Sequence, residues 1–385
     1  MEPDVKIEKR LRERLDEEPL LTLRLDVINK CNLRCVMCHY SDPIVAKKPA
    51  QSISAEQFAE YFSQVSPYVK DIMLSCGDEP LMSKHFVEIL DVIAAEPVPR
   101  DVGFCTNAML MTSRIRNAMI SKGATYVLLS MDGATKSTME RIRVGSSYDR
   151  VVGNIKALRD LRASTGARFP LMVLDFVMMR SNIHEGPIYV KMAKELGVGL
   201  LDFRHAVPSS YWDDIPEKME SHPKVFNYYR RRIVEEAAAV GIDVVIPDAF
   251  GDGGEEDCSA EEATATLDDF YAVQSDAAGS EVPTPKTFPD TFVTRKAINF
   301  SNEFFGKTYC ERPFSEVFIR NQKEVLPCAW HGKVMGRLDE GESISDIFWG
   351  EGFAKLRATM LQDEVDPGCR NCPIKQDMLP LSKKE

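Results

Sequence analysis

Three cysteines lie close together near the start of the chain. Cys31, Cys35 and Cys38 are separated by three and then by two residues. Cysteine thiolates hold iron–sulfur clusters, and a [4Fe–4S] cluster normally takes four of them. Three ligands would leave one iron with an open position, which is what a catalytic metal site needs. A structural zinc knuckle is the alternative for these three residues alone.

A second set of four cysteines lies near the other end of the chain. Cys310, Cys328, Cys369 and Cys372 are separated by seventeen, forty and two residues. Four thiolates fully ligate one [4Fe–4S] cluster, and the same four could hold a structural zinc ion. We expect a cluster here, and since full ligation leaves no open iron, we expect it to carry electrons rather than to bind substrate.

Three further cysteines, Cys76, Cys105 and Cys258, belong to neither set. Packing in the core is the ordinary role of an unpaired cysteine. The alternative is catalytic, because a thiol beside a reactive site can donate a hydrogen atom to a substrate radical. The N-terminus is densely charged and does not resemble a secretory signal, so we expect a cytoplasmic protein without disulfides.

Apolar runs and helical patterns alternate through the first 200 residues. This alternation predicts parallel strands joined by helices, and therefore an α/β fold with an open sheet or partial barrel of six strands. In such folds the active site lies at the carboxyl ends of the strands. The predicted strands are residues 21–27, 71–75, 101–105, 126–131, 171–179 and 199–203, and the predicted helices are 54–69, 85–95, 113–122, 148–164 and 184–196.

The loop that follows the first predicted strand carries Cys31, Cys35 and Cys38, and it resembles the cluster-binding signature of radical S-adenosylmethionine (SAM) enzymes. Further segments that resemble motifs of this family follow later strands, in the family's order. They are residues 75–80 (SCGDEP), 106–107 (TN), 130–133 (SMDG) and 143–148 (RVGSSY). Three departures are Cys76 and Ala108, each in place of a glycine, and Met37, where the family usually has an aromatic residue.

The resemblance implies a partial (β/α)6 radical SAM barrel that binds SAM through its first cluster. Glu79 is suited to the SAM amino group because a carboxylate pairs well with an ammonium ion. The residues that the resemblance assigns to SAM binding are Tyr40, Gly77, Glu79, Asn107, Ser130, Asp132 and Arg143.

The C-terminal cysteine set resembles that of a twitch domain, the short form of the SPASM domains appended to radical SAM enzymes, and implies one auxiliary [4Fe–4S] cluster. We expect a small α+β unit there, with a hairpin that turns near residues 321–322 and a helix over 351–361. The predicted organisation is a helix or tail at 1–19, a radical SAM core at 20–210, a helical connector with an acidic insertion at 211–300, and a twitch-like domain at 301–385.

The net charge of −11 comes mostly from one segment. Residues 251–280 hold nine acidic and no basic side chains, so the other residues together carry only −2. A pI near 5.3 argues against a nucleic-acid groove. The sequence contains no run of eighteen apolar residues, the length that a membrane-spanning helix would need.

These features predict an oxidoreductase that cleaves SAM to a 5′-deoxyadenosyl radical, removes hydrogen from a substrate C–H bond and dehydrogenates an alcohol of a sugar, cyclitol or other small natural-product intermediate. The expected reductant is a flavodoxin or ferredoxin. Alternatives are an epimerase with a cysteine hydrogen donor, a maturase of a ribosomally made peptide, and a non-catalytic iron–sulfur or zinc protein. Against a maturase, fewer than twenty residues precede the first strand, too few for a leader-peptide module.

Other polar side chains at predicted strand ends are candidates for contact with an anionic or hydroxylated substrate. They are Arg180, Arg204 and His205. Met172, Met178 and Met179 are expected to belong to the core or to line the site.

Overall fold

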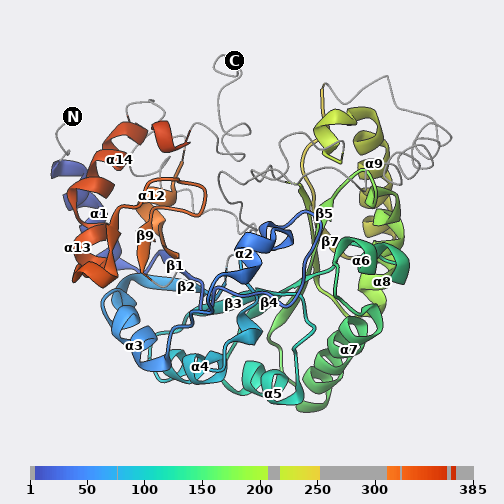
Figure 1. Cartoon of the computed structure of the whole chain (residues 1–385), viewed down its shortest axis with the longest axis horizontal. Coiled ribbons are helices and arrows are strands. Elements are labelled where there is room, and N and C mark those ends of the chain that lie inside the picture. Colours follow the sequence, from blue (N-terminus) through green and yellow to red (C-terminus); the bar gives the residue numbers. More distant parts are fainter. Residues whose placement is uncertain are drawn as a thin grey trace.

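The computed structural model describes residues 5–75, 77–206, 217–251, 310–320, 323–361 and 366–369. Ten strands form one sheet in the order β10-β9-β8-β1-β2-β3-β4-β5-β6-β7. The sheet is strongly curved and open, with helices α3, α4, α5, α7 and α8 along its outer side (Figure 1).

The strands are β1 (Leu21–Leu25), β2 (Val69–Met73), β3 (Asp101–Thr106), β4 (Tyr126–Ser130), β5 (Leu171–Met178), β6 (Leu200–His205), β7 (Asp243–Val245), β8 (Glu316–Arg320), β9 (Glu324–Leu326) and β10 (Gly336–Arg337). The α-helices are α1 (Val5–Glu17), α2 (Pro43–Lys47), α3 (Ala55–Ser63), α4 (Phe86–Ala94), α5 (Ser113–Ser121), α6 (Lys136–Ile142), α7 (Tyr148–Thr165), α8 (Gly186–Glu195), α9 (Pro223–Val240), α12 (Arg312–Ser315), α13 (Ile344–Phe348) and α14 (Glu351–Leu361).

The six predicted strands are confirmed as β1 to β6. Each pairs in parallel with the next strand along the chain, as a series of helical crossovers requires. All five residues of β4 are buried, because helices cover one face of the sheet and other side chains fill the inner face. The radical SAM-like partial barrel that the sequence predicts is therefore present, and β7 extends it by one more parallel strand.

The C-terminal hairpin is also confirmed, since β8 and β9 pair antiparallel on either side of residues 321–322. The sequence made no prediction of where this hairpin lies. β8 pairs in parallel with β1, from Thr22 opposite Glu316 to Leu25 opposite Ile319, so the C-terminal unit continues the barrel sheet. The physical reason is that β1 would otherwise present an unpaired edge to solvent.

The inner face of the sheet carries its own small apolar cluster. Leu128 of β4 and Val173 of β5 belong to it, together with Met73, Tyr126, Phe318, Leu326 and Ala329. Alternate residues of a strand point to the same face. Ser130 and Asp175, two positions further along β4 and β5, therefore lie on this inner face beyond the apolar cluster.

Within the described ranges, no helix has both the length and the apolar character that a membrane span requires.

Candidate active site

A cavity of about 180 Å³ opens at the carboxyl ends of the barrel strands. Its wall includes the loop with the first cysteine set and the residues that follow β2. It also includes residues at the carboxyl ends of β3 to β6. It is lined by Cys31, Leu33, Cys35, Met37, Cys38, His39, Ser75, Gly77, Asp78, Glu79, Cys105, Thr106, Asn107, Ser130, Arg143, Asp175, Val177, Arg204, His205 and Ala206. The position is the one expected for the active site of such a fold.

The loop with Cys31, Cys35 and Cys38 is held by main-chain contacts to the end of α6 and the residues just after it. The Arg34 amide donates to the Val144 carbonyl at 2.8 Å, and the Val36 amide donates to the Ile142 carbonyl at 2.9 Å. None of the three cysteines forms a disulfide. The loop thus presents three thiols to the cavity on a fixed backbone.

The surroundings of these thiols suit a cationic metal cluster. Burial raises the pKa of all three, that of Cys38 to about 12, so their thiolate forms need a positive partner. Hydrogen-bond donors already point at the sulfurs: Arg143 Nη1 lies 4.0 Å from Cys35 Sγ, and Asn107 Nδ2 lies 3.9 Å from Cys31 Sγ. Donors of this kind support thiolate ligands of an iron–sulfur cluster.

Glu79 is a buried carboxylate on the cavity wall, only 2 % exposed. The Thr106 hydroxyl donates to its Oε1 at 2.7 Å and the Asn107 amide donates to its Oε2 at 2.8 Å. Burial raises the pKa of Glu79 to about 7, although these hydrogen bonds act in the opposite direction. A bound ammonium group would offset the cost of burying this charge.

Backbone strain marks the turn before Glu79. Ser75 has a φ of 140°, in the region that favours glycine, and its hydroxyl donates to the Asp78 carbonyl at 2.8 Å. Ala108, just after Asn107, has a φ of 59° and is also in a conformation typical of glycine. Ser75 lines the cavity and Ala108 follows Asn107, which also lines it. Strain of this kind is concentrated at functional sites.

Two of the predicted SAM-binding residues, Tyr40 and Asp132, do not line the cavity but brace residues that do. Asp132 is fully buried, pairs with Arg143 Nη2 at 2.8 Å and accepts the Val177 amide at 2.8 Å. Tyr40 donates its hydroxyl proton to Asp78, which lines the cavity. Burial raises the pKa of Asp132 to about 6, against the lowering effect of Arg143.

The inner end of the cavity is polar, and its guanidinium, that of Arg204, pairs with Asp175 in the cavity wall and with Asp202 beside it. Arg204 Nε lies 3.1 Å from Asp175 Oδ1, and its Nη2 contacts Asp202, the residue beside Asp175 on the neighbouring strand. Oδ2 of Asp175 receives no hydrogen bond from any described residue, although the side chain is buried. Burial raises the pKa of Asp202 to about 7; Arg204 opposes this and Asp175 adds to it.

Cys105 lies in the same polar end, with its Sγ 3.1 Å from Ser130 Oγ. Burial, reinforced by the Asp175 carboxylate, raises its pKa to about 11. The side chain is therefore a neutral thiol at pH 7. The two other candidate hydrogen donors, Cys76 and Cys258, lie outside the described residues.

Of the other strand-end candidates, Arg204 and His205 line the cavity, whereas Arg180 is buried elsewhere. Met172, Met178 and Met179 all belong to the core, one of the two placements expected for them. In the second cysteine set, Cys328 is buried and close enough to Cys310 for the Cys310 charge to raise its pKa, after the larger effect of burial. Cys369 is described, while Cys372 lies outside the described residues.

Asp175 and Asp202 are the residues that sequence reasoning missed. Asp175 is the one charged residue of its strand, LMVLDFVM, and Asp202 follows two leucines at the start of LLDFRH. That signal was available, because a charged residue in a strand buried on both faces requires a partner or a function.

Comparison with known proteins identifies two regions. A family model described as the radical SAM superfamily matches residues 25–175, and a model of the SPASM iron–sulfur cluster-binding domain matches residues 310–373. A GTP 3′,8-cyclase of Listeria welshimeri is 24 % identical over 179 residues, 46 % of this chain and 52 % of that protein. An AdoMet-dependent heme synthase of Methanosarcina barkeri is 27 % identical over 188 residues, 49 % of this chain and 51 % of that protein. The chain thus spans about half the length of these curated relatives.

Solved structures with the same fold cover most of the chain. Streptococcus suis SuiB bound to S-adenosylmethionine superposes with a TM-score of 0.61 at 13 % identity, over 91 % of this chain and 71 % of that one. The protein anSMEcpe with bound AdoMet gives 0.58 at 14 % identity, over 92 % and 86 %. At these identities the likeness shows the fold alone.

Proposed function

The chain belongs to the radical SAM superfamily and carries a C-terminal SPASM iron–sulfur domain, and from that premise we propose that it is an oxidoreductase that dehydrogenates an alcohol group of a small polar substrate. The substrate class that we propose is a sugar, a cyclitol or another small natural-product intermediate. The observation that carries the proposal is Asp175, a buried carboxylate at the inner end of the cavity with an oxygen that receives no hydrogen bond from the described residues.

The two domains bind SAM and two [4Fe–4S] clusters. We assign Cys31, Cys35 and Cys38 to the SAM-binding cluster, and the auxiliary cluster to the set formed by Cys310, Cys328, Cys369 and Cys372. When bound, these groups supply a 5′-deoxyadenosyl radical that takes a hydrogen atom from carbon, and an acceptor for a second electron.

The chain's own residues would orient SAM above the polar end of the cavity. Glu79 is placed to accept the SAM ammonium, because the Thr106 hydroxyl and the Asn107 amide already fix its carboxylate. Arg143, held by the buried Asp132, would stabilise the thiolate of Cys35. Asn107, Ser130 and Gly77 complete the proposed SAM contacts on the cavity wall, and Tyr40 supports them through Asp78.

Dehydrogenation of an alcohol needs a base as well as a radical. Loss of a hydrogen atom from the carbon makes the attached hydroxyl more acidic, and its proton must then leave as the carbonyl forms. Asp175 is placed to accept that proton through Oδ2, while Arg204 holds its other oxygen. A positioned general base of this kind contributes roughly 10²–10⁴-fold to the rate.

Epimerisation is the second candidate, and a specific observation supports it. Cys105 lines the cavity as a thiol that stays protonated at neutral pH, the form from which a hydrogen atom can be donated to a substrate radical. The same substrate radical could thus be oxidised with Asp175 as the base, or quenched by a hydrogen atom from Cys105.

A peptide substrate is the third candidate. It is supported by solved structures of similar fold, in which SuiB is bound to its precursor peptide SuiA and anSMEcpe is bound to a peptide. Radical SAM enzymes use an external reductant, and we propose a flavodoxin or ferredoxin for this chain.

The test begins with anaerobic reconstitution, which is expected to give about eight irons per chain, four in each cluster. Reduced protein is then screened with cyclitols, sugars and short peptides for substrate-dependent release of 5′-deoxyadenosine from SAM, in deuterated water. A new carbonyl that Asp175→Asn suppresses, with 5′-deoxyadenosine release retained, supports oxidation.

Other outcomes contradict that proposal in distinguishable ways. Deuterium fixed at one carbon and lost in Cys105→Ala indicates epimerisation, and a modified peptide indicates a maturase. If no substrate or reductant yields 5′-deoxyadenosine while both clusters are intact, the chain is not an enzyme of this class.

A further inference from the structure

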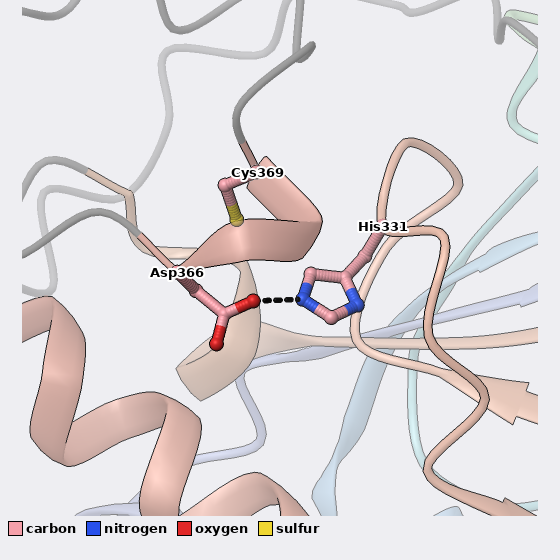
Figure 2. Close-up of side chains that lie close together, drawn as sticks. All are labelled: His331, Asp366 and Cys369. Atoms are coloured by element: carbon pink, nitrogen blue, oxygen red, sulfur yellow. Dashed lines mark hydrogen bonds and ion pairs between the residues drawn. The ribbon is translucent and has the colours of Figure 1, made fainter.

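A buried histidine joins two of the segments that carry the second cysteine set. His331 follows Cys328 by three residues and is only 2 % exposed. Figure 2 shows its ring, on the loop after β9, facing the short turn that carries Asp366 and Cys369. The ring therefore connects the segment of one cysteine with the turn that carries another.

Both ring nitrogens of His331 have a hydrogen-bond partner. Nε2 lies 3.0 Å from Asp366 Oδ1, and because a carboxylate can only accept, Nε2 is the donor. With its proton on Nε2, the ring accepts the Lys333 amide at Nδ1, at 3.3 Å. The two bonds fix the orientation of the imidazole and direct its Nε2 proton at Asp366.

Asp366 connects the imidazole to the backbone of Cys369. Its Oδ1 also accepts the Gly368 amide at 2.8 Å, and its main-chain carbonyl accepts the Cys369 amide at 2.8 Å. These two bonds close the turn over Pro367–Cys369. Because Asp366 Oδ1 binds the ring and the turn at once, the position of His331 sets the position of the Cys369 backbone.

The ring and the turn also lie in direct contact. A Cβ atom at Gly368 would lie 2.5 Å from His331 Nε2. The imidazole is buried and is bonded at both nitrogens, so it could not move aside at low cost. This close approach therefore requires glycine at position 368.

The other end of the same segment contacts Cys328. Burial raises the pKa of the Cys328 thiol well above its usual range, and the Trp330 amide, which donates to the sulfur, acts in the opposite direction. A main-chain donor of this kind supports a thiolate that binds a metal cluster. The segment from Cys328 to His331 thus supports two cysteines of the set, one through the Trp330 amide and one through Asp366.

We propose that His331 is a positioning residue of the auxiliary cluster site, because its bond to Asp366 fixes the turn that presents Cys369. The proposal rests on the assignment of Cys369 to the auxiliary cluster under the proposed function, and His331 itself is not a ligand. Cysteines from distant segments must meet at one cluster, and a turn that is already in place lowers the entropy cost of their meeting. His331 is therefore expected to affect retention of the auxiliary cluster and not that of the SAM-binding cluster.

The experiment compares the full-length wild type, His331→Phe and His331→Gln after anaerobic reconstitution. Phenylalanine keeps an aromatic ring without a donor, whereas the glutamine amide can donate from nearly the same place as Nε2. A chelator is added, and the loss of each cluster is followed by iron content and by the EPR spectrum of the reduced protein. Added SAM identifies the signal of its own cluster.

His331→Phe is expected to retain the auxiliary cluster about 10–100-fold less well, the usual effect of losing such a support. The EPR signal of that cluster is expected to change in this variant. His331→Gln is expected to restore both properties to those of the wild type. The SAM-binding cluster is the internal control in all three proteins, and His85→Phe, on the loop before α4, is the matched control for the substitution.

Gly368→Ala tests the contact between the ring and the turn independently. In the wild type the new Cβ atom would meet the imidazole, so faster loss of the auxiliary cluster is expected. In His331→Ala the ring is absent, and adding Gly368→Ala should then have no further effect. Additive effects of the two substitutions would contradict the contact.

Equal retention of the auxiliary cluster in the wild type and in His331→Phe overturns the proposal, and so does a His331→Gln variant that loses the cluster as His331→Phe does. Loss of both clusters together in His331→Phe would show a general role in folding and also contradicts it. If His331→Phe does not fold, Asp366→Ala removes the same bond at a more exposed position, and unchanged retention there contradicts the proposal equally. A wild type that holds only about four irons would overturn the cluster assignment and this proposal with it.

Discussion

Glu79 shows at the residue scale how a binding site carries an energetic cost before its ligand arrives. Its carboxylate is buried and takes its hydrogen bonds from the Thr106 hydroxyl and from the main-chain amides of Leu81 and Asn107, all neutral donors. A buried carboxylate with neutral donors keeps a high pKa, and that of Glu79 is about 7. A SAM ammonium would supply the charge that these donors do not.

This cost predicts how the stability of the cluster-free protein depends on pH. Because the folded pKa of Glu79, about 7, is above its unfolded value, the folded state binds the extra proton between them. Uptake of this proton favours the folded state fully below the unfolded pKa of about 4.3. The stabilisation is lost as pH rises through 7, a loss on the order of 3 kcal/mol. Unfolding free energy measured from pH 4.5 to 8 should fall more steeply in the wild type than in Glu79→Gln. Equal slopes would contradict the assignment.

Asp132 and Arg143 form a buried ion pair at 2.8 Å, and removing either charge leaves the other without compensation. Asp132→Ala and Arg143→Ala are each expected to destabilise the cluster-free protein by about 3–5 kcal/mol. The double variant should lose much less than the sum of the two. Urea unfolding measures this cycle.

The exposed pair of Lys136 and Asp149 supplies the matched control for that cycle. Asp149→Ala is expected to change stability by no more than about 1 kcal/mol. Additive losses at Asp132 and Arg143 would show that the two do not act as a pair.

At the scale of elements, a glycine of β3 makes room for an aromatic ring of β4. Gly103 of β3 lies opposite Tyr126 of β4, and a Cβ atom there would lie 2.1 Å from the tyrosine ring. The Tyr126 hydroxyl in turn bonds Asp71 of β2 at 3.1 Å. One glycine thus lets an aromatic ring lie across three strands beneath the polar end of the cavity.

Gly103→Ala is therefore expected to destabilise the protein by about 1–3 kcal/mol, because Tyr126 must move within a packed interior. Gly153 in α7 is the matched control, since it is exposed and a Cβ atom there meets nothing within 4 Å. Gly153→Ala is expected to stabilise by roughly 0.5–1 kcal/mol through helix propensity. Thermal unfolding compares the two, and a neutral Gly103→Ala would show that Tyr126 repacks freely.

At the scale of the whole molecule, the two ends of the described chain meet through one buried arginine. Arg357 of α14 donates to Glu8 of α1 at 2.6 Å, to the Pro313 carbonyl at 2.8 Å and to the Phe348 carbonyl at 2.9 Å. Its guanidinium also lies 4.2 Å from the centre of the Phe348 ring. The C-terminal region is thereby attached to the N-terminal helix as well as to β1.

Arg357→Ala is expected to cost about 3–5 kcal/mol, since it leaves the partly buried Glu8 carboxylate and two carbonyls without their donor. Lys355→Ala on the same helix removes only an exposed ion pair with Glu351 and is expected to change stability by under about 1 kcal/mol. Denaturant unfolding, with hydrogen exchange of α1 as a second readout, measures both. Similar losses in the two variants would contradict a special role for Arg357.

Local patterns in the sequence were enough to predict the parallel core. Apolar runs such as YVLLS and the turns that follow them locate β1 to β6 and the cysteine loop. The motifs that carry Glu79, Asn107 and Arg143 also reach the cavity wall, where all three side chains lie. Long-range pairing was not predictable in this way. The contact of β1 with β8 joins residues almost 300 positions apart, and no local pattern specifies which edge a hairpin will cover.

The same limit applied within the sites. The motif identifies Asp132 as a candidate site residue. Its buried ion pair with Arg143, however, cannot be inferred from the spacing of the two residues in the sequence. His331 lies within 3.0 Å of Asp366, thirty-five residues further along the chain, so only the folded backbone brings these two side chains together. The sequence did point to the positive φ values of Ser75 and Ala108. Ala108 stands where the resembling family has a glycine, and Ser75 precedes Cys76, which also stands in place of a glycine.

The parallel contact between β1 and β8 also makes the two halves of the molecule complementary fragments. β1 lies between β2 on one side and β8 on the other, so the piece before residue 251 contains a strand edge that the piece after residue 310 completes. A chain divided between these positions would yield two polypeptides that reassemble by strand addition. Co-expression of the pieces would then turn the assembly of the sheet into a bimolecular, concentration-dependent event, which a split reporter can follow.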